Sequence, residues 1–431
     1  MSDIDRAALS GTPGPDDVTD DVLPNGVRAL VRENHASPSV VVDGLLFGGA
    51  LLEPPDASGT AGFATAMLDR GTESRSFERL ADELEAVGAE ISFGAGRHTT
   101  RFHAKCLSED LADVLETLAE MLTSPAFPDA QVELVRGQIA TAIKQRQSST
   151  RHRSAVAFRE LAYGTDHPYG RDTDGTADSI AAVSRSDLVA YYERALHPSG
   201  GIVALVGAAP AAAALDALSR TIGAWQPGGA PPERLVVQPP PDAGEVRRDD
   251  VLVPGKSQSD IVLGNAAIAR EHPDWLATAV ANAVLGVFGL MGRLGENVRD
   301  KRGLAYYAFS RLAGGQGPGP WFASAGVNPA NVDEAIEATL HEMRRLRDEP
   351  VPDAELEDVN SYISGSLPLQ LETNGGVAGA LLDIAQYDLG LDYLQRFPSL
   401  VAAVTADDVQ RAAQAHLHPD AAAIAVAGPE S

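Results

Sequence analysis

The segment AAVSRSDLVAYYERALHPSGGIVALVG, residues 181–207, is repeated near the end of the chain as AAVTADDVQRAAQAHLHPDAAAIAVAG, residues 402–428. In each copy an N-cap residue, Ser184 or Thr405, has an Asp three positions later, which is typical of the start of a capped helix. Leu-His-Pro ends the helix in both copies, and an apolar strand follows. The repeat indicates two copies of one structural unit.

A second pair of segments supports the duplication. FPDAQVELVRGQI, residues 127–139, aligns without gaps on VPDAELEDVNSYI, residues 351–363. Pro in the first turn followed by an acidic residue is a helix-start signal. Convergent helix capping would not explain the shared Ala-Ala-Val and Leu-His-Pro, so we interpret the chain as two homologous domains.

The rest of the chain fits this division. We predict a disordered segment over 1–20, a first domain over 21–225, a Pro-rich linker over 226–247 and a second domain over 248–431. A chain of 431 residues is also too long for one ordinary core.

Within each half we expect the same order: strands of alternating apolar residues, a helix, two further strands and a long amphipathic helix. The expected ranges are 27–32, 39–47, 60–69 and 107–122, then 259–265, 274–285 and 332–347. A Gly-rich loop, 313–320, is read as a hairpin turn or as a substrate flap. The predicted fold class is α+β: two homologous domains, each a mostly antiparallel sheet with helices packed on one face.

Composition narrows the function. The net charge is −26, which argues against nucleic acid and anionic membranes as partners. Three sources of the acidity stay open: a GC-rich genome, a salt-adapted cytoplasm, and a chamber that attracts basic peptides. Cys106 is the only cysteine, so no disulfide within the chain or thiolate metal cluster is expected. The acidic N-terminus resembles neither a signal nor a transit peptide, and we expect a cytoplasmic protein.

One stretch carries a family resemblance. NVRDKRGLAYY, residues 297–307, preceded by Met291-Gly292-Arg293-Leu294, resembles a signature of the pitrilysin/insulinase-type zinc metallopeptidases, in the processing-peptidase-like branch. His-Pro-Tyr-Gly at 167–170 is also similar to that family. The resemblance runs from about Leu23 to about Pro429, and it implies the two-domain processing-peptidase fold.

The family's zinc motif is missing where the resemblance places it. Family members read Gly-Leu-Ala-His-x-x-Glu-His-Met-Leu-Phe-x-Gly-Thr, whereas residues 58–72 read SGTAGFATAMLDRGT. The two histidine positions hold Gly62 and Ala66, and the glutamate position holds Thr65. The glutamates of the family's third-ligand stretch have become Thr141 and Ala142.

This chain therefore lacks zinc chemistry at that position. Zinc needs imidazole or carboxylate ligands, and Thr cannot act as a general base near neutral pH. Other histidines offer no substitute: His341-Glu342 has Arg345 where a second histidine would complete H-E-x-x-H. His98 and His103 flank a strand and could share a face with little else, and the cationic neighbours of His152 disfavour a metal. We expect no cluster of two histidines and an acid, hence no metal in this chain.

The other half of the family's site is retained. In the family, the second domain contributes an arginine and a tyrosine that face the zinc across the substrate, and the resemblance places these at Arg299 and Tyr306. Such donors can hold a peptide backbone and stabilise an oxyanion. The structural alternatives are a C-terminal helix cation for Arg299 and a strand core residue for Tyr306. For Lys301, Arg302 and Tyr307 we prefer the structural interpretation.

These observations lead to one functional hypothesis and two rivals. The resemblance implies a non-catalytic subunit of a heteromeric zinc metallopeptidase. It would pair as a heterodimer with an H-x-x-E-H subunit that holds the zinc, and lend Arg299 and Tyr306 to a peptide substrate. Self-association also stays open. The first rival is a scaffolding pseudopeptidase subunit with no role in proteolysis. The second is an autonomous peptidase with an unrecognised metal site.

Overall fold

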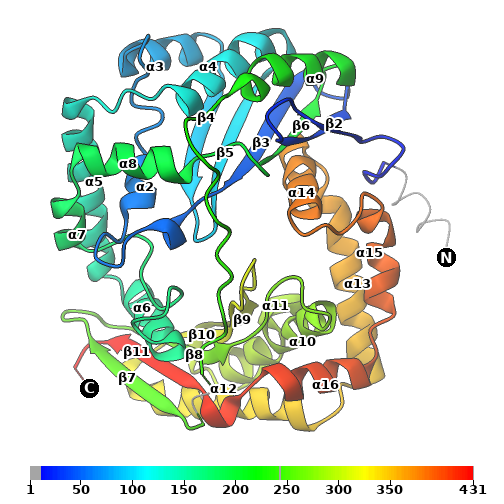
Figure 1. Cartoon of the computed structure of the whole chain (residues 1–431). Helices are drawn as coiled ribbons and strands as arrows, with labels where there is room; N and C mark the ends of the chain where they lie inside the picture. The colour runs from blue at the N-terminus through cyan, green and yellow to red at the C-terminus, as the bar shows by residue number, and fades with distance from the viewer. Residues whose placement is uncertain (1–10, 242–243, 431) are drawn as a thin grey trace. The chain divides into compact units, whose positions relative to one another are not determined.

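The structure is a computed structural model that describes residues 11–241 and 244–430. The chain forms two compact units (Figure 1). Unit 1 comprises Met1–Ile143, Thr173–Leu235 and Leu367–Arg396, and unit 2 comprises Lys144–Asp172, Val236–Ser366 and Phe397–Ser431. Each unit is built around one sheet.

Unit 1 contains a six-stranded sheet in the order β1-β2-β6-β3-β5-β4. Its strands are β1 (Thr19–Val22), β2 (Arg28–Glu33), β3 (Ser39–Phe47), β4 (Glu90–Ala95), β5 (Thr99–Leu107) and β6 (Ile202–Gly207). β2 and β6 are parallel, and all other neighbours are antiparallel.

Unit 2 contains a five-stranded sheet in the order β7-β11-β8-β10-β9. Its strands are β7 (Arg247–Leu252), β8 (Ser259–Ala266), β9 (Ala305–Leu312), β10 (Pro320–Val327) and β11 (Ala423–Gly428). Only β7 and β11 are parallel. This order repeats β2-β6-β3-β5-β4 of unit 1 with the same directions, which confirms the duplicated, mostly antiparallel fold. The Gly-rich loop joins the antiparallel strands β9 and β10, as the hairpin interpretation predicted.

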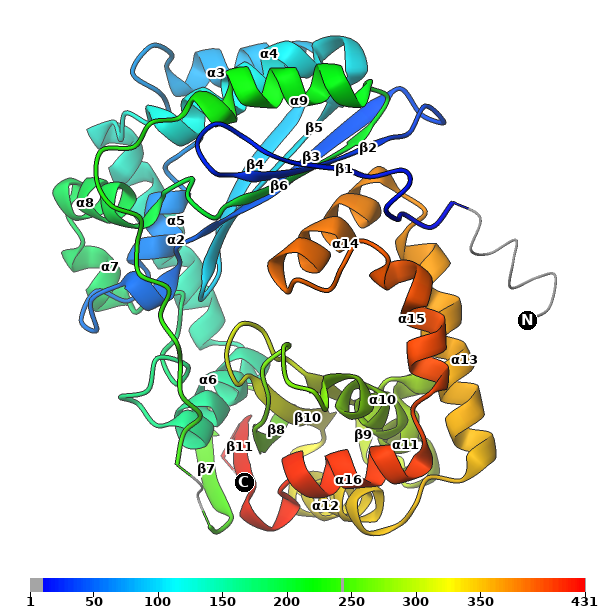
Figure 2. The ribbon, with the colours of Figure 1, turned by 45° about the vertical axis from the view of Figure 1, so that its right-hand side comes forward.

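The sheet of unit 1 is covered by helices on both faces. The helices are α2 (Thr60–Thr65), α3 (Phe77–Ala86), α4 (Leu111–Thr123), α7 (Ala177–Ala182), α8 (Arg185–Ala195), α9 (Ala211–Arg220) and α14 (Asn374–Gln386), with 3-10 turns η1 (Ala50–Leu52), η2 (Ser108–Asp110) and η3 (Ile222–Ala224). α3, α4 and α9 lie over one face, and α14 packs against β3 and β6 on the other (Figure 2).

Unit 2 follows the same plan. Its helices are α6 (Thr150–Tyr163), α10 (Trp275–Gly286), α11 (Phe288–Leu294), α12 (Val332–Asp348) and α16 (Ala406–His416), with a π-helix, η4 (Gly295–Lys301), and 3-10 turns η5 (Pro329–Asn331) and η6 (Pro419–Ala421). α10 and α12 pack against the sheet and α16 packs against both of them, while α6 packs against β7, β8 and β11. Three boundaries between the units fall within α5 (Asp129–Gln147), α13 (Asp353–Gln370) and α15 (Tyr393–Ala402), and the other two follow Asp172 and Leu235.

The units do not follow the two sequence halves that we predicted as 21–225 and 248–431. α6 comes from the first half but belongs to unit 2, and α14 comes from the second half but belongs to unit 1. The central strands explain why each sheet needs this extra helix: every residue of β6 and β11 is buried, so both faces must be covered. Asn374 fixes the start of α14 by donating to the backbone oxygen of Ser39 at 3.1 Å.

The predicted helix caps are present in both repeats. Ser184 accepts a hydrogen bond from the backbone N–H of Asp187, whose carboxylate accepts from the backbone N–H of Ser184. Thr405 and Asp408 form the same reciprocal pair at α16. The duplicated sequence pattern thus produces duplicated local geometry.

The predicted disorder of residues 1–20 was wrong for 11–20, while 1–10 lie outside the described residues. β1 begins at Thr19 and pairs with β2. Arg28 and Arg32 reach back to this segment and form ion pairs of 2.7 Å with Asp20 and Asp17. Those ion pairs give the acidic segment local partners. The Pro-rich stretch contains no helix or strand in the part of 226–246 that the structure describes.

In the described ranges no single helix is both long and apolar enough to cross a membrane. α10 and the segment 288–301 would meet that test only as a pair, and they are bent by 85°.

Candidate functional site

The segment that resembles the zinc motif forms α2 of unit 1. Glu53 caps the amino end of this helix, because its carboxylate accepts hydrogen bonds from the backbone N–H groups of Gly59 and Ala61 at 3.2 and 2.6 Å. Gly62 is exposed and Thr65 is buried, with no hydrogen-bond partner for its hydroxyl among the described residues. The helical frame is therefore intact although the chemical groups are gone.

The third-ligand stretch lies on α5, beside α2. The Arg136 guanidinium lies over the ring of Phe63 on α2, 5.3 Å from its centroid. Thr141 is exposed and donates to the backbone oxygen of Gly137 at 2.8 Å, and Ala142 is half-buried. The structure brings the two stretches together, yet Gly62, Thr65, Ala66, Thr141 and Ala142 supply no imidazole or carboxylate. These residues do not fit a zinc ion.

The other histidines considered from the sequence lie in different settings. Burial lowers the pKa of His98 to about 4, and Arg97 adds to this effect. A hydrogen bond between His103 Nδ1 and Asp43, at 2.6 Å, raises the pKa of His103. His152 Nε2 lies 3.4 Å from the Asp172 carboxylate in unit 2. Asp43 pairs with His103, while Asp172 pairs with His152 and also with Arg159 at 3.7 Å.

Arg299 lies on the π-helix η4 of unit 2. π-helical turns are rare and occur frequently at functional sites. Arg299 Nη1 is buried without a hydrogen-bond acceptor among the described residues, and its distance to Asp300 Oδ1, 3.6 Å, is that of an ion pair only. Arg299 is in the last turn of η4, so the helix-cation interpretation is compatible with its position. That interpretation leaves the unused donor unexplained.

Two buried polar contacts hold η4 in place. Arg293, directly before η4, forms two parallel hydrogen bonds of 2.8 and 2.7 Å to the carboxylate of Glu355. Within η4, the side-chain amide of Asn297 donates to Glu342, whose side chain is 4% exposed, at 2.5 Å. Together they anchor the segment that carries Arg299 to α13 and α12.

Tyr306 lies on β9, an edge strand of the sheet in unit 2. It is 81% exposed, so the expectation that it could be a core residue is wrong. η4 and β9 are in contact, and Gly303, with φ of +64°, makes the turn between them. The structure thus places Arg299 and Tyr306 on adjoining elements.

Tyr307 has the structural role that we preferred for it. Its hydroxyl donates to Asp260, which also accepts from Thr150, and the Arg151 guanidinium lies 4.9 Å from the centre of its ring. Burial, followed by the bond to Asp260, raises the pKa of Tyr307. Because neighbouring side chains on a strand point to opposite faces, fixing Tyr307 inward turns Tyr306 outward.

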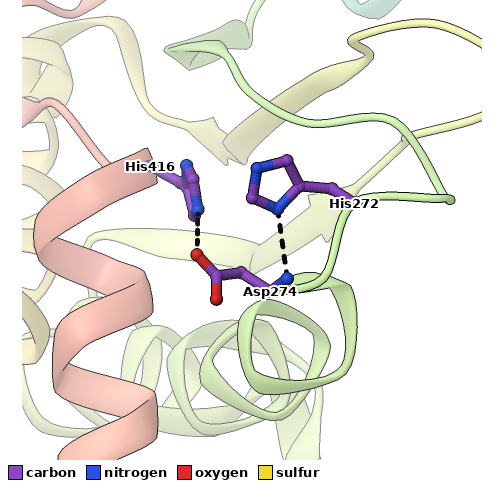
Figure 3. Close-up of side chains that lie close together, drawn as sticks. All are labelled: His272, Asp274 and His416. Atoms are coloured by element: carbon purple, nitrogen blue, oxygen red, sulfur yellow. Dashed lines mark hydrogen bonds and ion pairs between the residues drawn. The ribbon is translucent and has the colours of Figure 1, made fainter.

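The sequence analysis missed one cluster in unit 2. His272, Asp274 and His416 bring potential metal-ligating atoms within 4.8 Å of one another (Figure 3). The expectation that no two-histidine-plus-acid cluster occurs was therefore wrong. His272-x-Asp274 is visible in the sequence, but His416 lies 142 residues from Asp274 and joins it only through the packing of α10 on α16.

The contacts of this cluster favour a link between two helix ends over a metal site. Asp274 Oδ1 binds Arg411 at 2.6 Å and Oδ2 binds His416 at 2.9 Å. His272 Nδ1 accepts the backbone N–H of Asp274 at 3.1 Å. Hydrogen bonds with Arg411 first, and then with His416, lower the pKa of Asp274. Both carboxylate oxygens already have a partner, and a guanidinium beside them opposes a second cation.

The two repeated α+β units define the class of this protein as a peptidase-like chain. Unit 2 carries Arg299 and the exposed Tyr306, and α2 of unit 1 carries no metal ligands. Comparisons with known proteins also place the chain in a peptidase family. Residues 28–168 match the family model described as Insulinase (Peptidase family M16), and residues 182–361 match the model described as Peptidase M16 inactive domain. The chain belongs to peptidase family M16, as a pseudopeptidase-type member.

Relatives extend over nearly the whole chain. An uncharacterised zinc protease of Streptomyces coelicolor is 25% identical over 418 residues, which are 95% of this chain and 89% of the relative. A probable mitochondrial-processing peptidase subunit beta of Arabidopsis thaliana is 24% identical, covering 94% of this chain and 77% of the relative.

A solved structure shows the same fold. The crystal structure of a peptidase M16 inactive domain from Pseudomonas fluorescens superimposes with a TM-score of 0.88 at 24% identity, covering 96% of this chain and 98% of that one.

Proposed function

We propose that this chain is the non-catalytic subunit of a heteromeric zinc metallopeptidase. One observation carries the proposal: Arg299 has a buried, unused donor and Tyr306 is exposed, in a chain whose α2 and α5 lack metal ligands. A homologous H-x-x-E-H subunit would supply the zinc and the general base. The similarity to processing-peptidase beta subunits of Arabidopsis thaliana and Mus musculus supports a heteromeric arrangement.

The chemical role assigned to this chain is to hold and polarise the peptide. The guanidinium of Arg299 offers fixed N–H donors that keep their charge at any working pH. The Tyr306 hydroxyl can donate to the carbonyl oxygen as negative charge develops on it. Donors that are already positioned need no reorganisation during the reaction, so a second subunit can provide them as well as the catalytic one.

The surroundings of Tyr306 suit an extended peptide. β9 pairs with β10 on one side only, so its other edge has backbone groups that can add a peptide strand. Val287 and Leu290, which belong to the segment preceding η4, are 37% and 59% exposed. Exposed apolar side chains beside a cation fit a peptide better than a small polar metabolite.

The test is to reconstitute the chain with its H-x-x-E-H partner and to assay peptide cleavage. We expect Arg299→Ala to lower kcat by about a hundredfold to a thousandfold, as for the loss of an oxyanion donor. Arg299→Lys should recover part of that loss, and Tyr306→Phe should lower kcat without lowering binding of this chain to its partner. Lys301→Ala is the matched control, because Lys301 is an exposed cation that pairs with Glu296 at 2.7 Å.

Three results would overturn the proposal. Full activity of the partner alone, unchanged by this chain or by Arg299→Ala, would remove any role in cleavage. Unchanged cleavage and assembly with both substitutions would assign a scaffolding role. Stoichiometric zinc in the purified chain, with activity, would indicate an autonomous peptidase. The proposed location is the cytoplasm, where the buried Cys106 would stay reduced.

A further inference from the structure

The helical layer of unit 1 contains a cavity of about 620 Å³, away from α2 and α5. It opens where α4, α8 and α9 end. Its lining combines acidic, aromatic and small side chains from these helix ends and from the segment that follows α9: Glu116, Ala119, Glu120, Thr123, Ser124, Tyr192, Glu193, Leu196, Arg220, Thr221, Ala224, Trp225, Gln226, Pro227 and Gly228. We call it the α4–α8–α9 cavity.

The fixed charge around this cavity is negative. Glu116 and Glu193 are exposed and have no ion-pair partner among the described residues. The one cation of the lining, Arg220, is already paired with Asp216 at 2.9 Å. Burial raises the pKa of the Tyr192 phenol, and the negative charges of nearby carboxylates, Glu193 among them, raise it further. Two uncompensated carboxylates therefore face the opening.

Glu120 has a different role from these two. Burial alone would raise the pKa of Glu120, but hydrogen bonds from Ser74, Thr72 and Arg75 lower it below its usual range. Glu120 is thus ionised and already hydrogen-bonded by these neighbours, and it links the end of α4 to the loop before α3. Glu116 and Glu193 remain as the carboxylates available to a ligand.

The helix backbones add to the negative electrostatic potential of the cavity. α4 ends at Thr123, α8 at Ala195 and α9 at Arg220, and each helix contributes its carboxyl end to the cavity wall. The carboxyl end of a helix carries a partial negative charge that favours cations. Three such ends, together with free carboxylates, disfavour an anion.

Aromatic side chains complete the wall. Trp225 is 6% exposed. Tyr192 is half-buried and donates its hydroxyl to the backbone oxygen of Leu122 at 2.8 Å. Aromatic faces attract guanidinium and ammonium groups, most strongly when carboxylates lie nearby.

A metal ion fits less well. Among the residues that the structure describes, three ligand groups close enough to share one ion occur only at His272, Asp274 and His416 in unit 2. The cavity is also far larger than one ion needs. An organic cation with some apolar length would use the volume, the aromatic faces and the carboxylates together.

We propose that the α4–α8–α9 cavity binds an organic cation, the guanidinium or ammonium group of a basic peptide side chain. Glu116 and Glu193 receive the charge, and Trp225 and Tyr192 cover its apolar stem. A free polyamine has the same cationic chemistry and differs in offering no carbonyl. The inference does not depend on the proposed role in proteolysis.

The experiment measures binding to the full chain by fluorescence anisotropy, with a fluorescein-labelled Gly-Arg-Arg-Gly peptide as the probe. The neutral control is the same peptide with citrulline in place of arginine. The test variant is Glu116→Gln with Glu193→Gln, and the matched control is Asp113→Asn, an exposed carboxylate on α4 outside the lining. Spermidine competition distinguishes the two sources of the cation.

We expect saturable binding of the arginine peptide and much weaker binding of the citrulline peptide. The double variant should weaken binding by about tenfold to thirtyfold, because each partly exposed charge contact contributes roughly a factor of three to five. Asp113→Asn should change it less than twofold. Displacement by spermidine at lower concentration than by unlabelled peptide would assign the site to a free polyamine.

Two results would overturn the inference. The first is equal binding of the arginine and citrulline peptides, or none. The second is an equal loss in Asp113→Asn and the double variant, since net charge alone would then explain the attraction. Neither result bears on peptide cleavage, so failure here and failure of the proposed function can be told apart.

Discussion

The ion pair between Arg293 and Glu355 offers a quantitative test of how unit 2 holds Arg299. We consider Arg293→Met, which keeps an unbranched chain of similar length, together with Glu355→Gln and the double variant. Arg293 is 4% exposed and Glu355 is 26% exposed at the side chain. The pair precedes η4 directly, so its loss should loosen the segment that carries Arg299.

The expected magnitude follows from that burial. Removing one partner of a fully buried ion pair costs roughly 3–5 kcal/mol, whereas exposed pairs are worth about 0.2–1 kcal/mol. Glu355 can be partly rehydrated when it loses its partner, so Arg293→Met should cost about 2–3 kcal/mol. The double variant should cost no more than Arg293→Met alone. Arg293 Nη1 already lacks an acceptor among the described residues, so removing the whole pair also removes that unsatisfied group.

Two measurements check this reasoning. Denaturant unfolding of the full chain gives the coupling energy from the double-mutant cycle, expected at about 2 kcal/mol. Hydrogen exchange gives the local effect: the amides of Gly303 and Leu304, which donate to the backbone oxygens of Arg299 and Val298, should lose about thirtyfold protection. The control is Arg396→Met, because Arg396 and Asp392 form an exposed pair.

A coupling energy below about 0.5 kcal/mol, or unchanged exchange at Gly303 and Leu304, would refute the anchoring role. So would an equal effect of Arg396→Met on those two amides.

Three further predictions follow from the described contacts. Asp274→Asn should destabilise the chain by about 1 kcal/mol at pH 7, and the difference should shrink as the pH falls below about 4 and vanish only below the folded pKa: the pKa of Asp274 is lowered in the folded state, so its stabilisation is fully present above the unfolded pKa and is lost as pH falls through the lower folded pKa. Thermal melts from about pH 2 to 7 check this, and a difference that does not shrink between about pH 4 and pH 2 contradicts it. Residues 21–225 expressed alone should not melt cooperatively, because β3 and β6 lose the cover of α14, and co-expression with 226–431 should restore a cooperative melt by circular dichroism. Asn282→Ala should cost about 3 kcal/mol by denaturant midpoint, because Asn282 Oδ1 accepts from Trp321 Nε1 at 3.0 Å and from Ser310 at 2.8 Å, and both donors are buried; a cost no larger than that of Ser310→Ala would contradict this.

The features that the sequence predicted well are those set by neighbouring residues. The caps at Ser184 and Thr405 depend on an Asp three positions later, and both formed as expected. β3 and the start of α12 coincide with the predicted 39–47 and 332, because alternation and amphipathic periodicity mark them directly.

The features that escaped the sequence depend on long-range packing. The exchange of α6 and α14 is set by which sheet face remains uncovered, and no local pattern encodes that choice. Within the π-helical turn of η4, Asn297 binds Glu342, 45 residues later, and no local pattern marks that contact. Tyr306 and Tyr307 are adjacent and chemically alike, and only the bond from Tyr307 to the buried Asp260 decides which of them faces outward.

The residues at the two parts of the family's site differ in their effect on the stability of the fold. In unit 1, Gly62 and Thr141 are exposed, and a side chain added at Gly62 would meet nothing within 4 Å, so glycine is not required there by packing. Losing ligands at such positions leaves the core unchanged. In unit 2, Arg299 keeps a buried, charged N–H without an acceptor among the described residues, whereas the buried group left unpaired in unit 1 is the neutral Thr65 hydroxyl. An unsatisfied buried donor costs about 1–3 kcal/mol, a large part of a typical folding free energy. A chain with no use for that donor would gain stability by replacing it, whereas a chain that meets a peptide there would recover the cost on binding.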